Sequence, residues 1–185
     1  LQLDFNLAGE KFLDPFGTSL PRALMISTLM QRPARVPNEV LLNFHLGSVA
    51  RIGALLGKPG DLTPEDKKTI ARLDAFLGHD DWRDTFLSRY KPDVPRSATA
   101  GAVAVASQFR EKVKIQTGYE SFAVDIRRAV GQVPIFQLTL FFRHRAAEYK
   151  FADAASVANA AWRKRLVEDD ARKNANEYPD ALLQL

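Results

Sequence analysis

The chain has 185 residues, enough for about one domain with a sizeable hydrophobic core. Its apolar fraction of 46% and its charged fraction of 26% are typical of globular proteins. A net charge of +4 permits an acidic partner such as nucleic acid without requiring one. The absence of cysteine excludes disulfides, thiolate zinc sites, iron–sulfur clusters and cysteine nucleophiles.

The absence of cysteine fits a cytoplasmic protein, and the apolar residues indicate neither a membrane span nor a secretory signal. There is no run of about 18 apolar residues, so no membrane span is expected. The N-terminal stretch LQLDFNLAGE has neither a basic region nor a long apolar region, so it is not a secretory signal. The chain does not begin with Met, and we therefore expect that residues preceded it.

The first third of the chain predicts a strand–helix–strand unit. A short apolar strand over 10–14 ends in a turn rich in proline and glycine, and helical spacing follows over 20–31. The continuous apolar run 39–44, EVLLNF, is typical of a strand buried on both faces of a parallel sheet, and a further helix is expected over 48–56.

Two polar residues end these predicted strands. Because ligands bind outside the carboxyl ends of the strands in open α/β sheets, Asp14 is a candidate for chemistry. The alternative is that Asp14 caps a helix or turns the chain, as Asp-Pro often does. Asn43 ends the next strand, where it would either hydrogen-bond a ligand or cap the strand end.

The middle of the chain, 61–116, predicts a helical insertion. Thr63 and Pro64 form a helix start, as the N-cap and first-turn residues, and the helix continues to about Leu77. Shorter and longer helices are expected over 80–90 and 98–116. A connection of this length should have a function of its own, such as a lid or a partner surface.

The last third, 117–185, predicts an antiparallel hairpin and a long helix. Alternating apolar residues over 119–130 and the run PIFQLTLFF over 134–142 flank a short break. The helix is expected from Tyr149 to about Tyr178, with a buried stripe made of Phe151, Ala155, Ala158 and Trp162. Parallel strands followed by a terminal hairpin predict an α/β fold: the C-terminal half of a Rossmann-like, methyltransferase-type sheet over 1–60 and 117–185, interrupted by the insertion.

The histidines offer two readings. His45 and His144 both end predicted strands and would meet at the sheet rim, with Asp14 as a third group; a metal site needs three such ligands in suitable geometry, and no metal is expected. Alternatively, His144 with its neighbours Arg143 and Arg145 forms a basic rim that binds phosphate or the nucleic-acid backbone, or is simply a solvated strand end.

Four segments then occur in a definite order: LDPFGTSLP, VLLNFHLGSVAR, FLGHDDWRDTF and PIFQLTLFFRHRAAEYKFADA. In order and spacing they are similar to the three-Cys-motif partner proteins, over roughly residues 12–165. That family has a strand ending in Asp-Pro-aromatic-Gly, then a strand ending in Asn-Phe, a helix bearing Trp-Arg and a strand with a basic, histidine-bearing end. The resemblance implies a methyltransferase-like fold with S-adenosylmethionine as cofactor, and a cysteine-motif protein as partner.

The resemblance to amino-methyltransferases centres on Asp14-Pro15-Phe16-Gly17. In those enzymes an Asp/Asn-Pro-Pro-aromatic motif accepts hydrogen bonds from the target amine and stacks on a flipped base. Asp14 and Pro15 match that motif, while Phe16 and Gly17 depart from it. Phe16 would stack on the base if shifted by one position, or serve in a core or lid.

Two functions follow as hypotheses. The first is a methyltransferase-like enzyme acting on nucleic acid or a modified base, with Asp14 and Phe16 as catalytic residues and Pro15, Asn43, His45, Arg143 and His144 as substrate-binding residues. Its cofactor loop would precede Lys11, because the only nearby glycine, Gly9, makes no glycine-rich motif, and its cofactor-binding residues are therefore unknown. The second is a non-catalytic module that binds a protein partner through the helices of 61–116.

Overall fold

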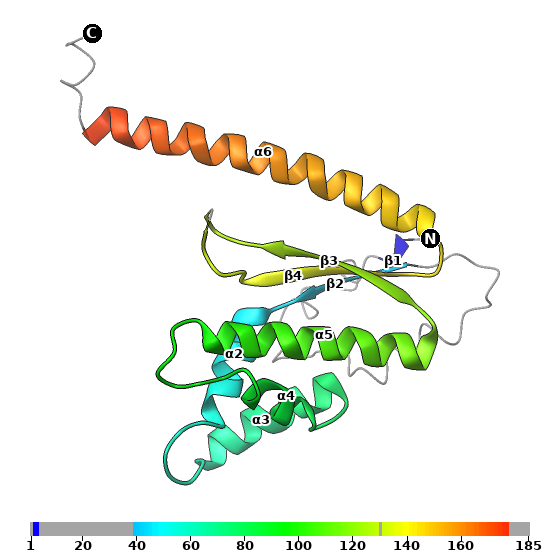
Figure 1. The fold of residues 1–185 in the computed structure, drawn as a ribbon, viewed down its shortest axis with the longest axis vertical. Helices are drawn as coiled ribbons and strands as arrows, with labels where there is room; N and C mark the ends of the chain where they lie inside the picture. Colours follow the sequence, from blue (N-terminus) through cyan, green and yellow to red (C-terminus); the bar gives the residue numbers. More distant parts are fainter. Residues whose placement is uncertain (1, 4–38, 130, 178–185) are drawn as a thin grey trace.

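The computed structural model describes residues 2–3, 39–129 and 131–177 of the chain. Within these ranges the strands form a four-stranded sheet in the order β1-β2-β4-β3. Figure 1 shows helices α2 to α5 on one side of this sheet and the long helix α6 on the other. The strands are β1 (Gln2–Leu3), β2 (Glu39–Phe44), β3 (Glu120–Ile126) and β4 (Phe136–Phe142).

Strand β4 is central and antiparallel to both of its neighbours. It pairs with β2 in a register that sets Val40 opposite Phe141, and with β3 in a register that sets Phe122 opposite Leu140. The predicted hairpin is therefore confirmed. Only the two-residue β1 runs parallel to its neighbour β2.

The predicted Rossmann-like, methyltransferase-type sheet is wrong for the described residues, which contain no parallel sheet of that type. Four helices separate β2 from β3, and the hairpin then returns to β2 through its second strand, so that β2 and β4 run in opposite directions. The apolar run of β2 suggested burial on both faces, yet Asn43 is exposed, because the face that carries it is covered only in part. An apolar run shows that a strand is buried, not the direction of its neighbour.

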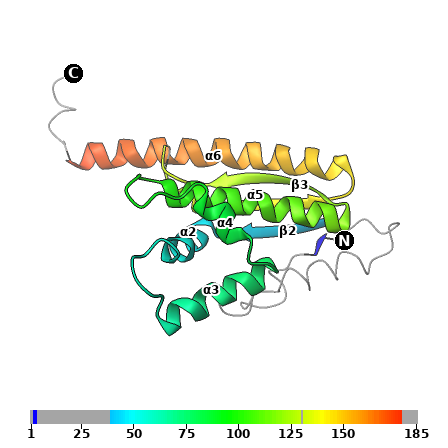
Figure 2. The ribbon, with the colours of Figure 1, turned by 60° about the horizontal axis from the view of Figure 1, so that its bottom comes forward.

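The helical layer on one face consists of α2 (Leu46–Leu55), α3 (Pro64–Leu77), α4 (Trp82–Leu87) and α5 (Ser97–Thr117). Figure 1 shows α5 along the sheet, with α3 and α4 farther from it, and Figure 2 also shows α3 apart from the sheet. The apolar positions predicted for α5, namely Val105, Phe109 and Val113, are all buried. The apolar face of α5 therefore packs into the core.

The start of α3 follows its sequence signals closely. The Thr63 hydroxyl accepts a hydrogen bond from the Asp66 N–H at 3.1 Å, and the Asp66 carboxylate accepts one from the Thr63 N–H at 3.3 Å. This capping box satisfies two backbone donors that the helix itself leaves unpaired. The helix ends at Gly78, whose φ of 72° lies in the left-handed region that glycine adopts without strain.

The main core fills the space between the sheet and the helical layer. Val40, Phe44 and Phe141 contribute from the sheet, Tyr119 contributes from the connection before β3, and the helices supply the remaining side chains. Phe109 of α5 packs against both Phe44 and Phe141, with ring centroids 5.8 and 6.3 Å apart. The burial of these apolar side chains away from water is the dominant favourable contribution to folding.

Helix α6 (Arg145–Glu177) lies over the opposite face, where a smaller apolar cluster forms. Ala147 is buried there, and Phe151 packs edge-on against Phe122 at 6.0 Å. The predicted helix is confirmed, although it begins four residues earlier. Its predicted stripe is not buried as a whole, because Ala158 is exposed and the other three positions are half-buried.

Candidate anion-binding pocket

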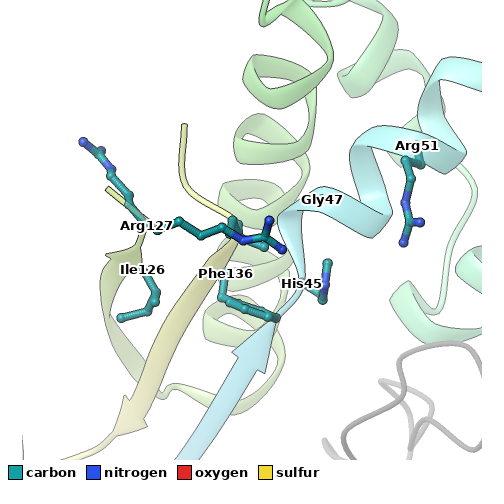
Figure 3. A pocket seen from close by; sticks show the side chains of 8 residues that line it. His45, Gly47, Arg51, Ile126, Arg127 and Phe136 are labelled. Atoms are coloured by element: carbon teal, nitrogen blue, oxygen red, sulfur yellow. The ribbon is translucent and has the colours of Figure 1, made fainter. Parts of the chain in front are cut away.

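A pocket of about 400 Å³ lies where β2 passes into α2, beside the turn of the β3–β4 hairpin. Figure 3 shows side chains entering it from the β2–α2 junction and from the hairpin. The volume falls in the lower part of the range for small-ligand sites, roughly 300–1,000 Å³. The lining residues are His45, Gly47, Arg51, Ile126, Arg127, Arg128, Ile135 and Phe136.

His45 stands at the junction as the N-cap of α2. Its Nδ1 accepts a hydrogen bond from the Ser48 N–H at 2.9 Å, and its ring packs edge-on against Phe136 at 4.5 Å. Burial lowers the pKa of the imidazole below its usual value, and the neighbouring Arg51 charge lowers it further. Because Nδ1 is an acceptor, the neutral ring carries its hydrogen on Nε2. His45 thus caps α2 through Nδ1, and its lowered pKa favours the neutral ring that this hydrogen bond requires.

Three arginines give the pocket its positive charge. Arg51 donates to the Ser48 hydroxyl at 3.2 Å, and Arg127 pairs with the Asp125 carboxylate at 3.0 Å. Among the residues that the structure describes, neither Arg51 nor Arg128 forms an ion pair. Arg51 and Arg128 are therefore exposed lining residues without a carboxylate partner in the described part of the chain.

A chain of polar contacts holds the hairpin side of the pocket in place. The Gln137 amide donates to Asp125 at 3.1 Å, and Arg110 of α5 donates to the Gln137 side-chain oxygen. Gln137 is only 6% exposed, so its hydrogen bonds cannot be replaced readily by water. Asp125 is thereby fixed next to Arg127 and sets the position of its guanidinium group.

The backbone N–H groups at the start of α2 are already used within the protein. Gly47 donates to the Ile135 carbonyl at 3.2 Å, while Ser48 and Val49 donate to His45. An anion in the pocket would therefore be held by guanidinium groups, with the positive end of the helix dipole adding a smaller attraction.

Of the seven site residues predicted from sequence, the structure describes four, and three of these four lie away from the pocket. The predicted catalytic residues Asp14 and Phe16, together with Pro15, lie outside the described residues. Asn43 is exposed on β2 opposite Leu138 and does not line the pocket. Of the predicted substrate-binding residues that the structure describes, His45 alone lines the pocket.

His45 and His144 do not meet at one rim of the sheet, contrary to the predicted arrangement. Because β2 and β4 are antiparallel, the end of β2 lies beside the start of β4, and His144 follows the far end of β4. Strands of six or seven residues place these ends about 20 Å apart. Arg143 lies at that far end, with its guanidinium 4.6 Å from the centre of the Tyr119 ring.

The pocket arginines were missed because they are far apart in the sequence. The adjacent pair Arg127-Arg128 near the end of the predicted strand segment 119–130 was a usable signal, and so was Arg51, one helical turn after Gly47. Nothing in the sequence alone joined these two segments.

Two features are absent from the described part of the chain. It contains no group of three or more His, Cys, Asp or Glu side chains arranged to hold a metal ion. No helix in that part combines the length and the apolar character that crossing a bilayer requires.

Comparisons with known proteins do not assign the chain to a family. No family model matches it, and searches of curated proteins and of solved structures also found no match. The similarity to three-Cys-motif partner proteins, with the cofactor, nucleic-acid and protein-partner roles that it implies, therefore stays a prediction from sequence.

Proposed function

We propose that this chain is a binding module for phosphate-bearing ligands, and that the pocket at the β2–α2 junction holds the anion. The observation that carries this proposal is that Arg51, Arg127 and Arg128 line one pocket, with a carboxylate partner among the described residues only for Arg127. Such a concentration of like charge is unfavourable in the free protein and is relieved by a bound anion.

Phosphate suits this arrangement better than a simple halide. The guanidinium group is planar and presents parallel N–H donors that match the oxygens of a phosphate. The neutral His45 ring can add an Nε2–H donor, since its Nδ1 is occupied by the Ser48 N–H. The overall positive charge of the chain would assist capture of such a ligand from solution.

Calorimetric titration with inorganic pyrophosphate tests this proposal. Replacing Arg51 or Arg128 by Gln should weaken binding roughly tenfold or more, because a charge-assisted hydrogen bond contributes about 1.5–3 kcal/mol. Affinity should also fall as salt is added. The matched control is Arg72→Gln, which removes an exposed arginine from α3, outside the pocket.

The control distinguishes a specific site from general attraction. We expect Arg72→Gln to bind pyrophosphate as tightly as the unaltered chain. If pyrophosphate produces no binding heat, or if all three variants weaken binding equally, the pocket is not a phosphate site.

A further inference from the structure

The pocket also has an apolar wall. Ile126 and Phe136 are cross-strand partners in the β3–β4 hairpin, so their side chains lie on the same face of the sheet. Both line the pocket, and Ile126 is 42% exposed although it is a large apolar residue. A site for a free inorganic anion has no need of this surface.

The Phe136 ring is held in position. It packs edge-on against His45 at 4.5 Å with an interplanar angle of 78°. The strand that carries it is fixed at its start by two backbone hydrogen bonds of Ile135, one from Gly47 at 3.2 Å and one to Ile126 at 2.9 Å. An aromatic ring that is fixed before binding loses little conformational freedom when a ligand packs on it.

Gly47 leaves space in the pocket because it has no side chain. A Cβ at this position would lie 3.2 Å from the His45 ring and 3.9 Å from the Ile135 side chain. A side chain here would therefore occupy part of the space between the two walls.

We propose that the pocket takes a nucleotide, with its phosphate on the arginines and its base on the wall formed by Ile126 and Phe136. This inference rests on the proposed phosphate binding and names its ligand class. A nucleotide joins an anionic group to a flat ring system within one small molecule, matching the two walls. Bases stack on aromatic side chains and on arginine planes, both of which are present.

The size of the pocket favours a single nucleotide unit. A volume of about 400 Å³ is near the lower limit for ligand sites, which argues against a dinucleotide cofactor. The nucleotide is either free or the terminal unit of a strand, since both carry the same phosphate and base.

The test compares the affinities of four probes for the full 185-residue chain. Adenosine 5′-monophosphate has phosphate and base, ribose 5-phosphate lacks the base, adenosine lacks the phosphate, and orthophosphate has neither sugar nor base. Calorimetry should show the nucleotide binding roughly 5- to 150-fold more tightly than ribose 5-phosphate, the factor expected for stacking of one base. A 5′-phosphorylated oligonucleotide in the same assay shows whether a free nucleotide or a strand end binds better.

Two variants of the apolar wall separate the base from the phosphate. Phe136→Leu and Ile126→Thr should each lower nucleotide affinity and leave affinity for ribose 5-phosphate unchanged. Both replacements suit a β-strand, so the fold should be kept. Phe122→Leu, an aromatic replacement in the same sheet outside the pocket, is the matched control and should bind nucleotide normally.

The outcomes separate this inference from the proposed function. If ribose 5-phosphate and the nucleotide bind equally well, or if Phe136→Leu and Ile126→Thr weaken both ligands alike, the base has no subsite and the nucleotide inference is overturned while phosphate binding stands. If no phosphate-bearing probe binds, phosphate binding itself is wrong. Binding of adenosine as tight as that of its monophosphate would overturn both.

Discussion

His45 serves both the fold and the pocket, and it links the two to pH. Its Nδ1 caps α2 by accepting from Ser48, and its ring supports Phe136. A protonated imidazole has no free acceptor at Nδ1, so protonation would remove the cap. Burial and the Arg51 charge both lower the pKa of His45, and each thereby protects the capping form.

This lowered pKa predicts that the folded state loses stability in mild acid. Below a pH of about 6.5 the unfolded chain binds a proton at His45 that the folded chain resists, so acid favours unfolding. His45→Asn keeps a capping oxygen but does not titrate in this range. In urea unfolding at pH 8 and pH 5, the variant should gain stability relative to the unaltered chain at the lower pH.

A second histidine variant is the control for this measurement. His144→Asn, in the exposed turn after β4, controls for the loss of a histidine and should not produce the same gain. A stability difference between His45→Asn and the unaltered chain that is equal at both pH values would show that the cap does not depend on protonation.

At the scale of elements, three helices meet around one phenylalanine. Phe86 of α4 is fully buried, and its ring lies against Gly53 of α2 and Gly101 of α5. A Cβ at Gly53 or Gly101 would come within 2.4 or 2.7 Å of that ring, closer than atoms can approach. These two glycines therefore allow α2, α4 and α5 to pack closely.

We predict that Gly101→Ala destabilises the protein by about 1–2 kcal/mol, because overpacking typically costs about 1–3 kcal/mol. The sign is informative, since Ala in place of Gly would otherwise stabilise a helix interior by about 1 kcal/mol. The free energy of unfolding measured in urea tests this. Adding Phe86→Leu, which removes the ring, should make Gly101→Ala much less harmful than it is alone.

The exposed Ala100→Ser in the same helix is the control and should change stability by less than about 0.5 kcal/mol. If Gly101→Ala instead stabilises the protein, the ring can move aside and the close packing is not required.

At the scale of the whole molecule, α6 is attached to the sheet mainly near its start. Ala147 and Phe151 belong to the small cluster on that face, whereas Val157 is 65% exposed. Figure 1 shows the helix continuing past the hairpin, with its later turns away from the sheet. The predicted partner surface on the helices of 61–116 stays untested, and large exposed apolar side chains are found on α6.

This arrangement predicts that shortening the side chains of two α6 residues lowers the free energy of unfolding by unequal amounts. Phe151→Ala should lower the free energy of unfolding by about 1–2 kcal/mol, less than the roughly 3–5 kcal/mol for a fully buried phenylalanine, because Phe151 is half-buried. Val157→Ala should change it by less than about 0.5 kcal/mol. Thermal or urea unfolding of both variants measures the difference, and equal losses would mean that the later turns of α6 are also docked.

The elements were predictable from sequence where their signals are local. Thr63, Pro64 and Asp66 lie within four residues and specify the start of α3: Thr63 and Asp66 through their mutual hydrogen bonds, and Pro64 through its fixed backbone angle. The alternation in β3 and β4 and the short break between them specified the hairpin, because nearby antiparallel strands pair at little cost in loop entropy. The helical periodicity of α5 identified Val105, Phe109 and Val113 as core residues.

Within the described residues, sequence by itself thus determined the helices, the hairpin and the buried positions of α5, since each depends on residues a few places apart. Only the tertiary structure decided that β4 lies antiparallel to β2. This direction places His45 beside Phe136 and far from His144. The tertiary structure also brought Arg51 to Arg127 and Arg128 across more than 70 residues of chain. The physical reason is that strand direction and pocket composition follow from how whole faces are buried together, and no local pattern encodes that choice.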